Sequence, residues 1–135
     1  MKARDIQSSL EQVKGSVNFV AESYKLVDQW EAANVGIEAV DIVLRFMEEH
    51  KDIDFGTPGP LVHFVERFSK HEEHLISSIR RKPTGHTTMM LRRVINGTRA
   101  RAKRDRLVKL MSEILLHPEA DADTREVART LLEDL

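Results

Sequence analysis

The chain has 135 residues, of which 41% are hydrophobic and 32% charged, with a formal net charge of −1. This composition is typical of a soluble globular protein and excludes a disordered one, and the length suits one domain over residues 1–135. No cysteine is present, which excludes disulfides and thiolate metal sites. We expect a cytoplasmic protein that does not enter the membrane, because there is neither a long apolar run nor a signal-peptide core.

The small net charge conceals a very uneven distribution. Residues 80–109 contain 11 Lys or Arg and a single acidic residue, Asp105, for a net charge of +10. Residues 1–79 carry a net charge of −6 and residues 110–135 one of −5. A chain of this kind either packs its acidic segments against its basic segment or binds a charged partner.

The first segment predicts one long helix. Its apolar residues recur from Ile6 to Val27 at alternating spacings of four and three residues, interrupted only mildly by Gly15. Such a stripe fits packing within a helical bundle or the seam of a coiled coil. We favour the bundle, because a dimeric coil usually needs more heptads.

A second predicted helix carries the acidic residues that we select as a candidate partner-binding face. Asp28 and Glu31 have the spacing of a capping box and predict its start. We expect the helix to end near Lys51, because Gly56 and Pro58 cannot continue it. Apolar residues repeat on its inner face, and the outer face is mainly acidic. The candidate partner-binding residues are Glu38, Asp41, Glu48, Glu49, Asp52 and Asp54.

Two glycines and two prolines then follow within the five residues 56–60. Thr57 is the expected N-cap of the third helix and Pro58 its first residue, where a missing amide has no consequence. The two prolines leave too few amides for a phosphate-binding loop. We therefore interpret the segment as a structural turn that orients helices, formed by Gly56, Thr57, Pro58, Gly59 and Pro60.

Start and stop signals divide the rest of the chain. A second capping-box spacing at residues 69–72 predicts a break or kink in the third helix, and Thr84 or Thr87 begins the fourth. The Asn96-Gly97 pair ends that helix, and Asp123 opens the sixth. No segment alternates as a strand does. We expect an all-α bundle of about six antiparallel helices, in which helix pairs could stack as in HEAT repeats.

Histidine offers the only candidates for catalysis. His63 and Glu66 could share a helix face as a base and its orienting carboxylate, but no nucleophile motif accompanies them. His71 and His74 are spaced i, i+3, whereas the zinc-protease helix uses i, i+4. We favour structural or surface roles for all four residues, and predict no enzymatic activity, no cofactor and no metal site.

The basic segment from Arg92 to Lys109 is a candidate surface for nucleic acid, since clustered Lys and Arg neutralise phosphates. It contains no aromatic residue that could stack on a base. We favour internal pairing of these charges with the acidic second helix, or a solvated surface, over nucleic-acid binding. The candidate residues are Arg92, Arg93, Arg99, Arg101 and Arg104.

One stretch resembles a known group of proteins. Residues 54–66 read Asp-Phe-Gly-Thr-Pro-Gly-Pro-Leu-Val-His-Phe-Val-Glu, and Arg-Lys-Pro-Thr at 81–84 and Ile-Asn-Gly at 95–97 follow. This pattern is similar to small all-helical bacterial proteins that accompany polymorphic toxins, including immunity proteins of contact-dependent growth inhibition systems. The resemblance covers residues 54–97.

The resemblance implies a non-enzymatic inhibitor that binds the C-terminal domain of one cognate toxin and blocks its active site or its access to substrate. Many such toxins are basic nucleases, toward which the acidic face could imitate a phosphate backbone. An acidic toxin surface that contacts Arg92, Arg99 and their neighbours is equally possible. Charge complementarity would then speed capture and reject wrong partners. The alternative function is a helical RNA- or DNA-binding module that uses residues 92–109.

Overall fold

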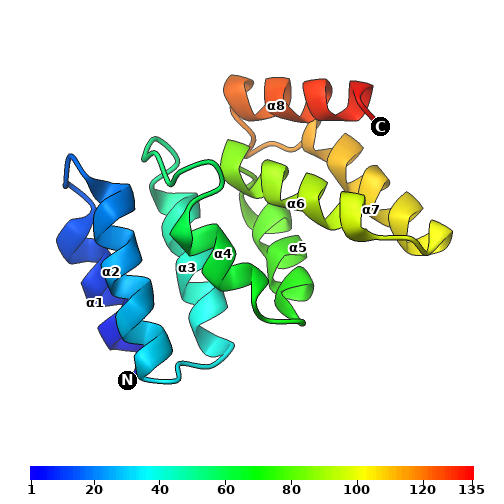
Figure 1. Ribbon diagram of the computed structural model, residues 1–135. Helices are drawn as coiled ribbons and strands as arrows, with labels where there is room; N and C mark the ends of the chain where they lie inside the picture. The colour runs from blue at the N-terminus through cyan, green and yellow to red at the C-terminus, as the bar shows by residue number, and fades with distance from the viewer. The chain divides into compact units, whose positions relative to one another are not determined.

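The computed structural model describes all residues from 1 to 135 and contains eight α-helices and no strand (Figure 1). The all-α prediction is confirmed, whereas the predicted count of about six helices is not matched exactly. None of the helices combines the length and apolar character required to cross a membrane. The helices are α1 (Ala3–Val13), α2 (Phe19–Ala32), α3 (Glu38–Glu49), α4 (Pro60–Glu66), α5 (His71–Arg81), α6 (Gly85–Gly97), α7 (Arg101–Ile114) and α8 (Ala122–Glu133).

Two of the predicted helices are each divided in two. The long first helix breaks after Val13, and the chain reverses over residues 14–18 before α2 begins. Gly15 and Asn18 are poor helix formers, and the break lets α1 pack against α2. The third predicted helix ends at Glu66 and α5 begins at His71, which places a helix boundary where the spacing at residues 69–72 predicted a break or kink.

Residues that the sequence predicted as helix starts do cap a helix where the cap involves only neighbouring residues. They do not where burial of a nearby side chain requires the preceding helix to continue. Thr84, one of the two predicted starts, caps α6, its Oγ1 accepting a hydrogen bond from the Thr87 amide at 3.2 Å. Asp28 begins no helix, because fully buried Trp30 keeps α2 against the core until Ala32. The last helix begins two residues earlier than predicted, capped by Asp121.

The chain forms two compact units, residues 1–74 and residues 75–135. In unit 1, α1 packs against α2 and α3 against α4, and the two hairpins meet through α1 with α3 and α2 with α4. In unit 2, α6, α7 and α8 pack pairwise around an aliphatic core. The single domain over residues 1–135 stays a prediction.

This division separates the charges of the chain. Unit 1 contains 8 basic and 14 acidic residues, for a net charge of −6, and unit 2 contains 13 basic and 8 acidic residues, for +5. Every Phe, Tyr and Trp lies in unit 1. The two units therefore differ both in the sign of their charge and in the side chains that they can offer to a ligand.

Three buried phenylalanines hold unit 1 together at the end where α2 begins. The Phe55 ring meets the Phe19 ring edge to face with centroids 5.5 Å apart, and lies 6.1 Å from Phe46. Phe19 and Phe46 are themselves stacked at 6.1 Å. Because Phe55 belongs to the connection between α3 and α4, this cluster ties the connection to both α2 and α3.

The Gly/Pro turn brings Phe55 into that cluster. Gly59 has φ +91°, and a Cβ atom built on it would lie 1.7 Å from the Phe55 carbonyl oxygen. Helix α4 begins at Pro60 with Gly59 as N-cap, so Thr57 as N-cap and Pro58 as first helical residue are both wrong. The start is shifted because the chain must first pass through a conformation open only to glycine.

We expect Gly59→Ala to destabilise unit 1 by more than about 2 kcal/mol, because strain at a glycine-only conformation adds to overlap with the backbone. Urea unfolding followed by the fluorescence of Trp30, the single tryptophan, measures this. Gly15→Ala is the control, since a Cβ atom there meets nothing within 4 Å. Equal unfolding midpoints for the two variants would show that the turn tolerates a side chain.

Candidate functional site

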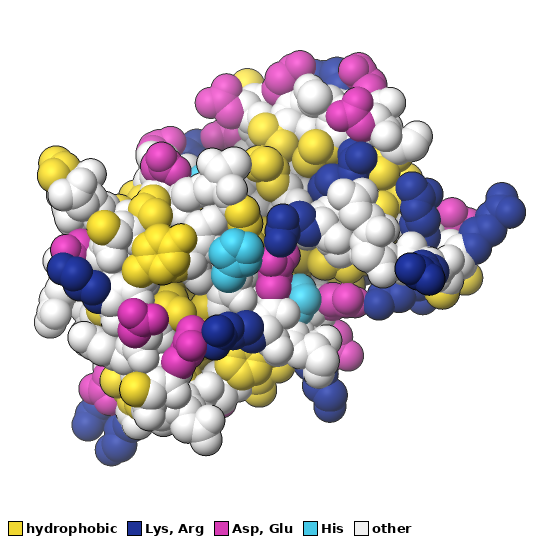
Figure 2. Space-filling view, viewed as in Figure 1, with side chains coloured by type: hydrophobic (Ala, Val, Ile, Leu, Met, Phe, Trp, Pro, Cys, Tyr) yellow, Lys and Arg dark blue, Asp and Glu magenta, His cyan; other side chains and the backbone are white.

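An open groove of about 550 Å³ lies in unit 1, between the start of α2 and the segment that follows α3. Its rim carries two exposed large apolar side chains: Val17 is 98% exposed and Tyr24 is 55% exposed. Figure 2 shows an apolar side chain standing out from this end of the unit. The lining residues used below are Val17, Phe19, Val20, Tyr24, Ile53 and Asp54.

The local fold explains why the groove is there. The break between α1 and α2 leaves Val17 in a connection with no helix over it. The floor is Phe19, which Phe46 and Phe55 hold in place from below. On the far side, the Asp54 carboxylate accepts a hydrogen bond from the Gly56 amide at 2.9 Å, which fixes a negative charge at the rim.

The predicted acidic face is only partly assembled. Glu38 is exposed at the start of α3, and Asp41 accepts a 2.8 Å hydrogen bond from Arg45 Nε. Asp52 is exposed beyond α3. Glu48 is only 7% exposed, so its place on an exposed acidic face is wrong. Because α3 packs against both α1 and α4, its buried face is wider than the single stripe that the sequence suggested.

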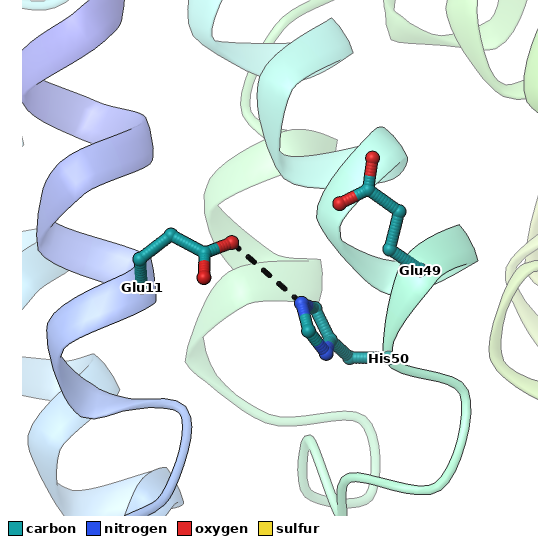
Figure 3. A group of neighbouring side chains, drawn as sticks. All are labelled: Glu11, Glu49 and His50. Carbon is teal, nitrogen blue, oxygen red and sulfur yellow. Dashed lines mark ion pairs between the residues drawn. The ribbon is translucent and has the colours of Figure 1, made fainter.

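The remaining residue of that set, Glu49, meets residues that the sequence did not bring together. Glu49 and His50 at the end of α3 converge with Glu11 of α1 (Figure 3), and their potential ligand atoms lie within 4.8 Å of one another. The His50 ring packs on Phe46 with centroids 4.4 Å apart. No spacing in the sequence predicts this group, because Glu11 lies far from Glu49 and His50 along the chain and only the packing of α1 on α3 brings them together.

The group has the chemistry of both an ion-pair network and a metal site. Two carboxylates and an imidazole could hold a zinc-type ion. In the structure, the Glu11 carboxylate already has two partners: its Oε2 lies 2.6 Å from Lys14 Nζ and its Oε1 lies 3.6 Å from His50 Nε2. The hydrogen bond from Lys14 lowers the pKa of Glu11, and His50 adds to the effect. The arrangement acts as an electrostatic link between α1 and α3.

The basic residues fall into two groups. Arg92 is structural: its Nε donates to Asn96 Oδ1 at 2.9 Å and its Nη1 to the Leu131 carbonyl oxygen at 2.7 Å, which joins α6 to α8. Arg93 is exposed on α6. Arg99, Arg101 and Arg104 gather around the start of α7, and no carboxylate of unit 2 forms an ion pair with any of the three.

The other histidine candidates are brought together only loosely. His63 and Glu66 share a face as expected, but Nδ1 and Oε1 are 4.0 Å apart, too far for a hydrogen bond, and His63 is 58% exposed. The His71 ring hydrogen-bonds the Phe68 carbonyl oxygen at 2.7 Å, where it supports the boundary between α4 and α5. With His74 it belongs to no group of three potential metal ligands.

Comparison of the chain with models of protein families, with curated proteins and with solved structures finds no match. The groove in unit 1 and the unpaired cations of unit 2 are therefore the features from which function is inferred.

We expect Glu11→Gln to lower the stability of unit 1 at neutral pH. The pKa of Glu11 is lower in the folded state than its ordinary value of 4.5, so the carboxylate stabilises the fold above pH 4.5. That contribution is lost as the pH falls through the lowered pKa, and the variant and the parent should then unfold alike. Melting temperatures measured between pH 3 and pH 7, on the order of ten points, test this. A difference that is the same at every pH would contradict the link.

Proposed function

We propose that the chain is an immunity protein that binds the toxic C-terminal domain of one cognate bacterial toxin, a nuclease, and neutralises it without chemistry of its own. The observation that supports this best is the groove of unit 1. Val17 at 98% exposure contributes almost no burial to the fold, and exposed apolar side chains around a groove are typical of protein-binding sites. Tyr24 beside it is a residue type that often anchors such interfaces.

The charge around the groove favours a basic partner. Unit 1 has a net charge of −6, and Asp54 presents a carboxylate at the groove rim, whereas the cation that also lines the groove, Lys14, is paired with Glu11. A field of this sign attracts a positively charged toxin domain and accelerates its capture, while the apolar rim supplies burial once the two proteins meet. Nucleases carry positive charge where they hold the phosphates of their substrate, so an acidic inhibitor seated there excludes the substrate.

The architecture of unit 1 suits such a role. We propose that its hairpins, α1 with α2 and α3 with α4, stack as HEAT-type helix pairs. The connections within both hairpins, residues 14–18 and 50–59, then lie at one end of the stack and together border the groove (Figure 1). Stacked helix pairs commonly bind partners over surfaces of this kind. The proposal places the protein in the bacterial cytoplasm, where it would protect the cell that makes it.

Co-expression tests the function directly. The proposal predicts that a gene for a large secreted protein with a variable C-terminal toxin domain lies directly upstream. With that domain as the probe, we expect this chain to restore growth to cells that produce it and to form a complex with it. A chain that neither binds nor neutralises the domain is not its immunity protein.

Val17→Asp and Tyr24→Ala test the surface. Each should weaken the complex by about 10-fold or more, since interface anchors commonly contribute more than 1 kcal/mol. Val17→Asp should leave the free energy of unfolding within about 0.5 kcal/mol, because the side chain is exposed. Leu116→Asp in unit 2 is the matched control, an equally exposed apolar residue at 88%. If Leu116→Asp weakens the complex and Val17→Asp does not, the groove is the wrong surface.

A further inference from the structure

We propose that the cations around the start of α7 form a second binding surface, for the phosphate backbone of a nucleic-acid duplex. We call it the α7 basic surface. It lies in unit 2 and is separate from the groove of unit 1. Lys and Arg side chains gather over α7 in Figure 2. The surface consists of Arg99, Arg101, Arg104, Arg106 and Lys109.

These cations lack partners within their unit. No carboxylate of unit 2 forms an ion pair with any of them, and the one acid among them, Asp105, leaves a net charge of +4. Other arginines of unit 2 are engaged: Arg129 pairs with Glu126, and Arg92 bonds to the Leu131 carbonyl oxygen. The α7 basic surface is thus a local concentration of uncompensated positive charge.

The side chains present select a phosphate backbone over other anionic partners. Four of the five cations are arginine, whose planar guanidinium binds phosphate, as it binds carboxylate, through two parallel hydrogen bonds, so the choice between these anions depends on the surrounding side chains. Unit 2 contains no aromatic residue, so nothing there can stack on the bases of a single strand. The exposed large apolar residues of unit 2 all lie outside residues 98–110, so an acidic protein would find no apolar core to bury. A duplex backbone needs neither feature.

The position of Arg101 opposes the stability of the helix that carries it. The first turn of α7 contains no acidic residue, and a cation there faces the positive end of the helix dipole. Replacing Arg101 should therefore weaken duplex binding while it raises the melting temperature, whereas replacing a side chain with a structural role would lower that temperature.

The experiment uses the full chain, without toxin, and a fluorescently labelled DNA duplex of about 20 base pairs, with anisotropy measured from about 50 to 300 mM salt. We expect log K to fall with log salt at a slope of about −4, since each phosphate contact contributes about −0.9. The Arg101→Gln/Arg106→Gln pair should flatten the slope by about 1.8. Asp105→Asn should tighten binding, and Arg101→Lys should retain most of it.

The control is Arg129→Gln, an exposed arginine of α8 that already has a partner, and it should leave the slope unchanged. Three results would overturn the proposal: no duplex binding at the lowest salt, an unchanged slope in the double variant, or binding of polyglutamate in preference to the duplex. Because toxin is absent from the assay, its outcome is independent of whether the chain is an immunity protein.

Discussion

The packing of Phe55 between Phe19 and Phe46 is the contact on which the rest of unit 1 depends. It requires the connection after α3 to fold back sharply, and only glycine allows the backbone of Gly59 to pass so close to the Phe55 carbonyl. The same contact holds Phe19 still as the floor of the groove and brings Asp54 to its rim. The Gly/Pro turn thus positions the surface that we propose for a partner.

Charge is the second constraint, and the fold distributes it by unit. The acidic unit contains every aromatic residue and an apolar groove, which are the features of a protein-binding surface. The basic unit has an aliphatic core and uncompensated arginines on α7, which are the features of a phosphate-binding surface. The two proposals therefore concern different partners and different residues, and a single chain of small net charge can serve both.

Sequence signals were reliable where one helical turn contains the whole interaction. The Thr84 cap involves only Thr87, three residues away, and these were the two residues at which the helix was predicted to begin. Asp28 has an equally good local pattern, yet the burial of Trp30 extends α2 through it. The Gly/Pro turn was located correctly and its helix start misplaced, because the start depends on where Phe55 must pack.

The sequence by itself determined the all-α class, the place of the turn and the separation of charge, since these follow from spacing and composition over short stretches. Only the tertiary structure decided that Glu48 is buried, that Val17 is exposed and that Glu11 meets His50. Each of these outcomes depends on which helices pack together. A periodic pattern shows which face of a helix is apolar, but not how many neighbours will cover the helix or which residues those neighbours will bring.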